Sequence, residues 1–436
     1  MAKNSTKQQV IVGLDIGTTK IATVVGYRTE EGLINVIGHG FSKSTGVEYG
    51  QIRNIDKTVN GIISSCEEAA ERSHQEISEV FVGIAGHHIK TTTYNYPLFR
   101  HGKVDPICQQ EIDEMRNTVF NVTPNAGEEV IDVIPQRYVI DQDHETTDPV
   151  GEMANEVLGT YQVITGKQSE VNKIRYCCEK CQVNPNEIIL EPIASALACL
   201  SDQDKERGVA LVDIGGGTSD LIIFIDGNPV YTKVIALGGN VITKDIATVC
   251  NIPEDLAEQV KIKHGTCIVG QSSPDCLITI PRPYNQEPIQ INQNYLAQII
   301  NSRVEDEILS IINSEIEASG YKNRLANAAG IVLTGGGANL RHIQQLCSYV
   351  TGMPTRIGLP EHGFVHTLSN DIKKPNFATA LGLLKYGALQ DDAEFIPNSS
   401  SDATKGNNNN SGNGKDFWGI FKNVPNWIKN AVDNIT

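Results

Sequence analysis

Two segments of this chain follow the same plan, and this internal repeat limits the possible folds more than any other feature. Residues 13–25 read GLDIGTTKIATVV, and residues 211–224 read LVDIGGGTSDLIIF. In each segment an apolar strand ends in Asp-Ile-Gly, a turn of small residues follows, and a second apolar strand comes next. The two copies lie about half of the expected folded length apart, so the repeat predicts two similar lobes.

The turns of both segments carry residue types that suit phosphate binding. Glycines let backbone N–H groups approach phosphate oxygens closely, and threonine hydroxyls add hydrogen-bond donors. Two ordinary β-hairpins with glycine turns are the alternative, but the presence of a second copy favours phosphate binding. The spacing leaves open whether the ammonium group of Lys20 points to phosphate or to solvent. The candidate phosphate-binding residues are Gly17, Thr18, Thr19 and Lys20 in the first copy and Gly215, Gly216, Gly217 and Thr218 in the second.

The first strand of each copy ends in a carboxylate. We expect Asp15 and Asp213 to face one cleft from opposite lobes. A magnesium ion in a protein prefers few carboxylates and several waters. These two side chains are therefore suited to hold the water shell of a magnesium ion.

A third glycine-rich segment, IVLTGGGANLRHIQQL, occupies residues 331–346. A strand of β-branched residues runs into Gly335, Gly336 and Gly337, and we expect a helix to begin near Asn339. Glycines at a helix N-terminus let a flat base or a ribose lie against the backbone. The segment is therefore a candidate binding loop for the adenosine part of a nucleotide.

These segments, with LEPIASALACL at residues 190–200 and NFATALGLLKYGAL at residues 376–389, resemble the ATPase superfamily of actin, sugar kinases and heat-shock chaperones. Within that superfamily, IVGLDIGTTK, VDIGGGTSD, KIKHG, GIVLTGGGANL and EEVIDVIPQRYVIDQ resemble the FtsA family of bacterial cell division proteins. The resemblance extends over essentially the full chain. It implies an α/β protein with an actin-like (ribonuclease H-like) two-lobed fold and an FtsA-type inserted subdomain.

The resemblance also implies how the chain is divided. We expect lobe I to comprise residues 10–85, 164–205 and 370–389, the inserted subdomain residues 86–163, lobe II residues 206–369 with an outer subdomain at 225–310, a flexible linker residues 390–414, and a membrane-targeting helix residues 415–436. The linker assignment has independent support, because apolar residues give way there to Ser, Asn, Gly and Asp.

Further site residues follow from the resemblance. Glu191 occupies the place where chaperone-type ATPases keep a carboxylate near the attacking water, so the implied catalytic set is Asp15, Asp213 and Glu191. Glu258 and Lys261 lie three residues apart on one helix face and would close over the adenosine, although an exposed ion pair is the alternative. Members of the family are generally poor ATPases. We therefore expect ATP with magnesium as a structural and regulatory ligand, and at most weak hydrolysis.

The C-terminal residues 415–436, KDFWGIFKNVPNWIKNAVDNIT, follow the polar linker. On a helical wheel the apolar residues gather on one side and the lysines on the remainder, which is typical of a helix that lies in a membrane interface. A core helix is the usual alternative, but the polar linker argues against docking on the body. Each large apolar side chain contributes about 1.5–3 kcal/mol when buried, so one tail binds weakly and many tails on one filament bind firmly. The expected membrane-contacting residues are Phe417, Trp418, Phe421, Trp427, Ile428 and Ile435.

The formal net charge of −16 argues against a nucleic-acid partner, because phosphate backbones are bound through dense Lys and Arg. We expect neither a signal peptide nor a membrane span, since no apolar run approaches the required length.

The ten cysteines are expected to be reduced thiols. This includes Cys178 and Cys181, which have CxxC spacing but recur at helical spacing with apolar residues.

The resemblance implies a filament-forming adaptor that ties the FtsZ ring to the cytoplasmic face of the inner membrane at the division site and helps to recruit later division proteins. Its implied partners are the C-terminal tail of FtsZ on residues 225–310, further copies of the chain, membrane lipid and other division proteins. A pilus-assembly adaptor and a small-metabolite kinase of the same superfamily are the alternatives. A chaperone is disfavoured, because only about fifty residues follow the helix at 376–389, too few for a β-rich peptide-binding domain.

Overall fold

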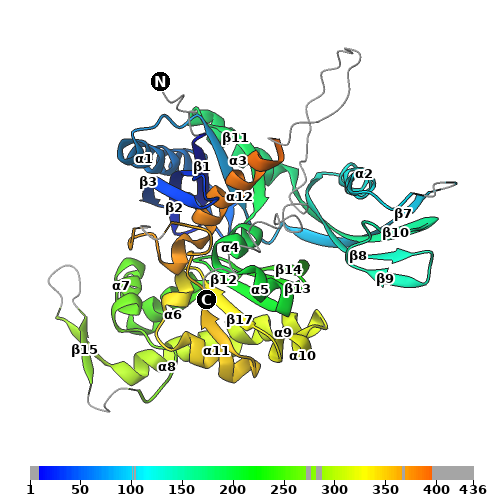
Figure 1. Cartoon of the computed structure of the whole chain (residues 1–436). Helices are drawn as coiled ribbons and strands as arrows, with labels where there is room; N and C mark the ends of the chain where they lie inside the picture. The colour runs from blue at the N-terminus through cyan, green and yellow to red at the C-terminus, as the bar shows by residue number, and fades with distance from the viewer. Residues whose placement is uncertain are drawn as a thin grey trace.

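The structure is a computed structural model of the chain, and it describes residues 9–394 except for 101, 103–104, 272–275, 281–286 and 366–368. Figure 1 shows two lobes, one above the other, and a third unit that projects to one side of the upper lobe. The two copies of the sequence repeat lie in different lobes, as predicted.

The first copy forms the centre of a five-stranded sheet in the order β11-β6-β1-β2-β3. Every residue of β1 is buried, because helices cover both faces of the sheet. Helices α1 and α3 pack on one face, and α4 and α12 pack on the other. The strands are β1 (Ile11–Ile16), β2 (Lys20–Arg28), β3 (Ile34–Lys43), β6 (Glu79–Ile84) and β11 (Asn184–Leu190), and the helices are α1 (Ile55–Ser73), α3 (Gln168–Lys180), α4 (Glu191–Cys199) and α12 (Ala378–Glu394).

The second copy forms a sheet with the same topology, in the order β18-β17-β12-β13-β14. In both sheets the repeat supplies an antiparallel hairpin, and the next strand pairs in parallel with its first strand. The predicted plan of strand, small-residue turn and strand is therefore confirmed in both copies. The strands are β12 (Val209–Ile214), β13 (Ser219–Ile225), β14 (Asn228–Ile235), β17 (Gly330–Thr334) and β18 (Thr355–Ile357).

Helix α4 and the helices of the lower lobe cover the two faces of this second sheet. The remaining helices of the lower lobe are α5 (Asp202–Arg207), α6 (Gly239–Cys250), α7 (Glu254–His264), α8 (Gln293–Arg303), α9 (Ser310–Ala318), α10 (Lys322–Ala326) and α11 (Ile343–Thr351), with a π-helical turn at Val304–Leu309. A small hairpin of β15 (Leu277–Ile280) and β16 (Ile289–Asn292) lies at the edge of the lobe (Figure 1).

The predicted start of the helix after Gly337 is wrong by a few residues. Gly336–Asn339 forms a short 3-10 turn, and α11 begins only at Ile343. The segment between them pairs with residues 266–267, since the N–H of Cys267 donates to the carbonyl of Arg341 at 2.9 Å. His342 adopts a left-handed conformation with φ 65°, and this tertiary contact holds the chain out of the helix.

The projecting unit is an antiparallel sheet in the order β7-β10-β8-β9, with α2 against it (Figure 1). Its elements are β7 (Lys90–Phe99), α2 (Gln109–Phe120), β8 (Glu128–Ile140), β9 (His144–Thr146) and β10 (Glu156–Lys167). The guanidinium of Arg100 is buried and contacts the carboxylate of Glu111 at 3.1 Å. Its second nitrogen donates to the carbonyl of Ala154 at 3.0 Å, so one arginine ties α2 to the loop before β10.

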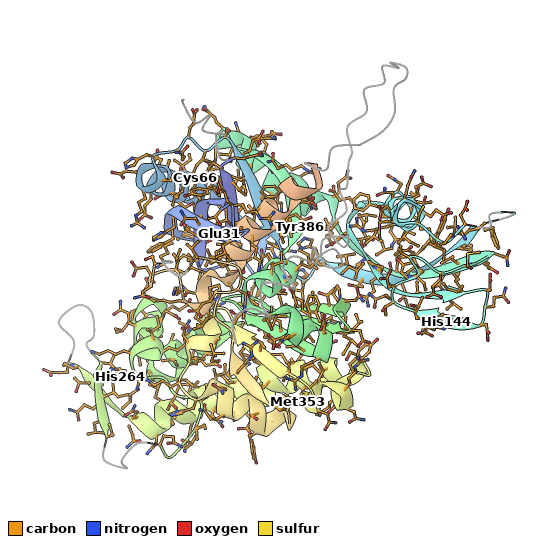
Figure 2. All side chains as sticks on the ribbon, in the orientation of Figure 1. Glu31, Cys66, His144, His264, Met353 and Tyr386 are labelled. Atoms are coloured by element: carbon orange, nitrogen blue, oxygen red, sulfur yellow. The ribbon has the colours of Figure 1, made fainter. Side chains whose placement is uncertain are left out.

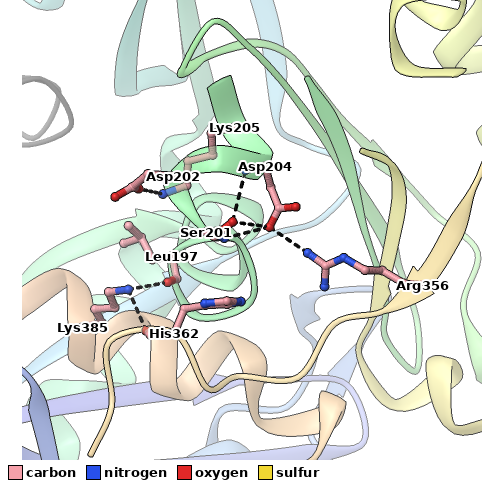
Figure 3. A network of polar contacts seen from close by, with 8 residues as sticks. All are labelled: Leu197, Ser201, Asp202, Asp204, Lys205, Arg356, His362 and Lys385. Atoms are coloured by element: carbon pink, nitrogen blue, oxygen red, sulfur yellow. Dashed lines mark hydrogen bonds and ion pairs between the residues drawn. The ribbon is translucent and has the colours of Figure 1, made fainter. Parts of the chain in front are cut away.

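Helix α12 joins the two sheets. Tyr386 of α12, labelled in Figure 2, donates a hydrogen bond to Glu187 of β11 at 2.6 Å. On another side of the helix, the ammonium of Lys385 donates to the carbonyls of Leu197 at 2.9 Å and His362 at 2.7 Å (Figure 3). Lys385 thereby connects α12 with α4 and with the loop after β18.

The predicted start of the linker at residue 390 is wrong, because α12 continues to Glu394. The other sequence-based assignments at the C-terminus lie outside the described residues. This applies to the membrane-targeting helix at 415–436 with Phe417, Trp418, Phe421, Trp427, Ile428 and Ile435, and to the linker beyond residue 394. Among the described residues, no helix is both long and apolar enough to cross a membrane. The thiol of Cys178 is buried in the core beside α1, as the helical spacing predicted, whereas Cys181 is only partly buried; Cys177, which was not predicted, is buried as well.

Candidate functional site

A cavity of about 410 Å³ lies between the two hairpin turns of the sequence repeat. Pockets for small molecules commonly have about 300–1,000 Å³. The structure brings together almost the whole set of residues predicted from the sequence. Those that line the cavity are Asp15, Gly17, Thr18, Thr19, Lys20, Glu191, Asp213, Gly215, Gly216, Thr218, Glu258, Lys261, Gly335, Gly336, Gly337 and Asn339.

Gly217 is the predicted residue that is not part of this lining. A side chain at Gly217 would lie 2.7 Å from the hydroxyl of Thr18 and 2.9 Å from the backbone of Tyr49. The glycine is thus required by close contact with the opposite lobe rather than by the cavity.

The two turns are tight and face each other. The N–H of Gly17 donates to the carbonyl of Lys20 at 3.0 Å, and the N–H of Gly215 donates to that of Thr218 at 2.9 Å. A side chain at Gly216 would meet the Thr19 methyl group at 2.3 Å. The turns therefore come from different lobes and meet at one end of the cavity.

The N-terminus of α6 is attached to the second turn. The N–H groups of Gly239 and Asn240 donate to the carbonyls of Gly215 and Gly216, each at 2.8 Å. Gly239 and Asn240 also line the cavity, although they were not predicted. A helix N-terminus carries a partial positive charge, so this placement favours an anion beside the turn.

Five carboxyl groups line the cavity, and the pKa is raised in four of them, Asp15, Glu191, Asp213 and Asp220. Burial raises the pKa of Asp15 to about 6, and it also raises the pKa of Asp213. The pKa of Glu191 is raised well above its usual range by burial and by the neighbouring Asp15. Mutual repulsion adds to burial in each of these groups except Asp213. Burial thus disfavours the ionised forms of these carboxyl groups, and a cation bound beside them would favour those forms.

Asp220 is the carboxyl group that the sequence analysis missed. It pairs directly with Asp213 across the second hairpin, and burial raises its pKa well above the usual range. Its Oδ1 atom is buried without a hydrogen-bond partner among the described residues. The signal was present in VDIGGGTSD, where the register of a tight hairpin places the second aspartate opposite the first.

Lys20 is the cation whose positive charge acts on these carboxylates, since it lowers the pKa of both Asp15 and Asp213. Its ammonium donates to the carbonyl of Asn376 and lies 3.7 Å from the ring centroid of Phe377. Burial lowers the pKa of Lys20 to about 8, against the attraction of Asp15 and Asp213. The ammonium of Lys20 therefore lies at the cavity wall formed by residues 374–379 and not in solvent.

The glycine loop after β17 lies against the end of β12. Gly335 has φ 82°, and a side chain there would meet Oδ1 of Asp213 at 2.1 Å. A side chain at Gly337 would meet Ile214 at 2.4 Å, whereas one at Gly336 would meet nothing within 4 Å. Gly335 and Gly337 therefore allow the backbone to approach, while Gly336 faces open space in the cavity.

Glu258 and Lys261 form an ion pair on α7, with Nζ and Oε2 separated by 2.7 Å. Lys261 is only 7% exposed, and its ammonium also donates to Gly239 O at 2.9 Å and Thr243 Oγ1 at 2.8 Å. Burial lowers the pKa of Lys261. The alternative of an exposed ion pair is therefore wrong for the lysine, which fastens α7 to the start of α6.

Residues 374–379 form a wall of the cavity that was not predicted. Lys374, Pro375, Asn376 and Thr379 line it, together with Arg341 from the segment before α11. The sequence analysis included Asn376 and Thr379 only in the helix at 376–389 and assigned no role to Lys374 and Pro375. Residues 374–379 reach the cavity because α12 packs on the first sheet beside the second hairpin. A local sequence pattern does not reveal this long-range packing.

Comparisons with known proteins agree with this architecture. The family model described as "Cell division protein FtsA" matches residues 210–382, and the one described as "SHS2 domain inserted in FTSA" matches residues 86–165. The FtsA protein of Pseudomonas aeruginosa is 33% identical over 380 residues, which cover 87% of this chain and 89% of the relative. That of Escherichia coli K12 is 30% identical over 392 residues, covering 88% and 91%.

Solved structures share the fold at low sequence identity. The PilM-PilN type IV pilus biogenesis complex has a TM-score of 0.62 at 16% identity and covers 87% of this chain and 98% of its own. MreB5 of Spiroplasma citri bound to ADP has a TM-score of 0.54 at 14% identity, with coverage of 89% and 99%. The fold is thus actin-like, with an inserted subdomain of the SHS2 type.

Proposed function

This chain belongs to the FtsA family of cell division proteins, and from that membership we propose that it is an ATP-binding, filament-forming adaptor of the division machinery. It ties the FtsZ ring to the cytoplasmic face of the inner membrane and helps to recruit later division proteins. The observation that carries the nucleotide part is the cavity between two phosphate-type turns, with a glycine loop at its side.

The turn residues are assigned to the phosphates of ATP. Gly17 lets the backbone approach the phosphates, and Thr18 and Thr19 offer N–H and hydroxyl donors from one lobe. The turn of 215–218 contributes in the same way from the other lobe. The backbone at Gly336 leaves room for the adenosine. The same fold holds ADP in one solved MreB5 structure and AMPPNP in another, which supports this assignment.

The carboxylates fit a magnesium ion held through water. Burial and the neighbouring Asp213 raise the pKa of Asp15, and Oδ1 of Asp220 is buried without a hydrogen-bond partner among the described residues. A hydrated cation beside these groups would stabilise their ionised forms and offer that oxygen a donor. Asp15 and Asp213 are the residues we assign to the water shell of the ion. When bound with ATP, magnesium would neutralise part of the phosphate charge.

Glu191 is assigned to the attacking water, but we propose slow turnover. Its pKa is raised well above the usual range by burial and by neighbouring carboxylates. A carboxyl group that keeps its proton cannot accept one from water, so Glu191 is a poor general base in this environment. The nucleotide then acts mainly as a structural and regulatory ligand.

The membrane and partner assignments rest on the sequence and on family membership. The amphipathic pattern of residues 415–436 supports a reversible interfacial anchor, which becomes firm only when many copies assemble. We assign the FtsZ tail to residues 225–310 and self-association to the body of the protein. Together these assignments place the protein at the division site, on the inner surface of the membrane.

A vesicle co-pelleting experiment tests this function. Full-length protein and protein without residues 415–436 are each mixed with anionic vesicles, with and without ATP and magnesium. We expect full-length protein to pellet, more so with ATP, and the shortened protein to stay in the supernatant. Equal pelleting of both proteins would reject the anchor. Labelled ATP with a panel of small metabolites covers the kinase alternative, for which we expect no phosphotransfer.

A further inference from the structure

A second, smaller cavity borders Glu191. It shares Ile16, Gly50 and Glu191 with the main cleft, so these three residues form the wall between the two spaces. Its other polar side chains are Glu170 at the start of α3 and His88. The cavity is small, with space for about one water molecule.

His88 stands where the chain leaves β6 to enter the inserted subdomain. Its side chain is only 3% exposed. The amide nitrogen of Gln51 lies 3.4 Å from Nδ1 of His88, and as a donor it makes Nδ1 the acceptor. In the neutral ring the proton is then on Nε2. Within the described part of the chain, this N–H finds no hydrogen-bond partner.

A buried donor without an acceptor destabilises the folded protein, because it has lost its hydrogen bonds to water. The ring does not escape the cost by becoming charged, because burial lowers the pKa of His88 to about 4. The nearby cations Lys167 and Lys173 and the ring of His87 also lower this pKa, while Glu170 raises it. A neutral ring with a free N–H therefore faces a space bordered by two carboxyl groups.

Gly83 on β6 and Gly86 in the turn after it leave space for the side chains of Glu191 and His88. A side chain at Gly83 would meet Cγ of Glu191 at 2.9 Å. One at Gly86, whose φ is 127°, would meet Nδ1 of His88 at 2.9 Å. The side chain of Glu191 thus packs against the backbone at Gly83, and that of His88 packs against the backbone at Gly86. These contacts hold both side chains beside the cavity.

We propose that a water molecule in this cavity accepts a hydrogen bond from Nε2 of His88 and donates to the carboxyl groups of Glu191 and Glu170. One acceptor and two donor bonds satisfy a buried water, which typically makes about three. His88 is then a positioning residue for Glu191, and it links the root of the inserted subdomain to the cleft. The inference rests on the proposed nucleotide site, in which Glu191 faces the attacking water.

Two variants of full-length protein test the proposal. His88→Phe keeps a ring of similar size but removes the N–H, and His88→Gln restores an amide donor in nearly the same direction. We expect His88→Phe to lower kcat for ATP hydrolysis about tenfold, with KM and the Kd for ATP unchanged, and His88→Gln to recover most of the loss. A wild-type kcat in His88→Phe, or equal loss in both variants, overturns the proposal.

A crystal structure of the wild-type protein gives a second reading that does not depend on turnover. We expect one ordered water within hydrogen-bond distance of His88 Nε2 and a Glu191 oxygen, and no such water in His88→Phe. A dry cavity in the wild type overturns the proposal. Failure of the proposed function is a different result, since wild-type protein would then bind no ATP at all.

Discussion

Ser195 donates a hydrogen bond to Oδ2 of Asp213 across 2.6 Å. Ser195 lies on α4, and Thr379 of α12 donates to the same oxygen at 3.3 Å. The carboxylate at the end of β12 is therefore oriented by two hydroxyl groups from helices that pack between the sheets. Hydrogen bonds to the charged form also oppose the rise in the pKa of Asp213 caused by burial.

Replacing Ser195 by alanine should weaken magnesium-dependent nucleotide binding. The change removes the shorter of the two bonds, which contributes about 1.5–3 kcal/mol when one partner is charged. We expect the Kd for ATP to rise about tenfold with magnesium and to stay nearly unchanged in EDTA, measured by calorimetry. Thr379→Val is the matched control, with a smaller effect because its bond is longer. An equal loss in EDTA would show that Ser195 acts through general stability instead.

Alanine substitutions at Gly335 and Gly336 test the different roles of two neighbouring glycines in the loop after β17. Gly335→Ala should lower thermal stability, because the methyl group meets Asp213 and φ is positive; we expect a cost of about 1–3 kcal/mol. Gly336→Ala should leave stability unchanged and weaken ATP binding, since its side chain enters open space in the cleft. Thermal melts and ATP titrations on both variants check this. Reversed effects would contradict the assigned positions.

Lys261→Met should destabilise the protein and reduce its affinity for ATP. The variant removes the hydrogen bond to the carbonyl of Gly239 and the ion pair with Glu258, at a cost of about 1–3 kcal/mol. The start of α6 then loses its support beside the second turn. Lys263→Met, an exposed position on the same helix, is the control and should behave like the wild type. Unchanged ATP affinity in Lys261→Met would show that α7 does not support nucleotide binding.

Lys385 makes stability depend on pH in a predictable direction. Burial lowers the pKa of Lys385 from 10.5 to about 7 in the folded protein. Well below pH 7, Lys385 is protonated in both the folded and the unfolded protein, so the folded protein bears the full cost of burying the charge. Between about pH 7 and pH 10 the unfolded chain binds more protons, so stability from this group rises with pH.

The variant Lys385→Met removes this pH dependence. The difference in melting temperature, variant minus wild type, should therefore be most favourable to the variant near pH 6 and should fall as the pH rises to 9.5. Taking the difference cancels the titration of groups that the two proteins share. A difference that stays constant across this range would mean that Lys385 is not buried as an unpaired cation.

Trp418 and Trp427, changed together to glutamate, should release the protein from vesicles while ATP binding stays intact. The change places two charges on the apolar side of the expected interfacial helix. Co-pelleting and ATP titration measure the two properties separately. Changing both tryptophans to phenylalanine is the control, and that variant should still pellet. Retained pelleting of the glutamate variant would count against the anchor.

Local patterns in the sequence were sufficient for the hairpins and their carboxylates. The alternation of apolar residues, the glycine turns and the terminal Asp15 and Asp213 all depend on a few neighbouring residues, and the structure places each as expected. The start of α11 was misjudged for the opposite reason. A contact with residues 266–267, more than seventy positions earlier in the chain, overrides the local helix preference there.

The sequence by itself thus determined the repeated lobes, the glycine turns and the amphipathic character of residues 415–436, because each depends on the spacing of nearby residues. Only the tertiary structure decided the charge state of the cleft, the burial of Lys261 and the support of Asp213 by Ser195. It also placed His88 and Glu191 beside one small cavity. A pKa and a buried hydrogen bond depend on which distant segments exclude water from a side chain, and that follows from how the whole chain packs.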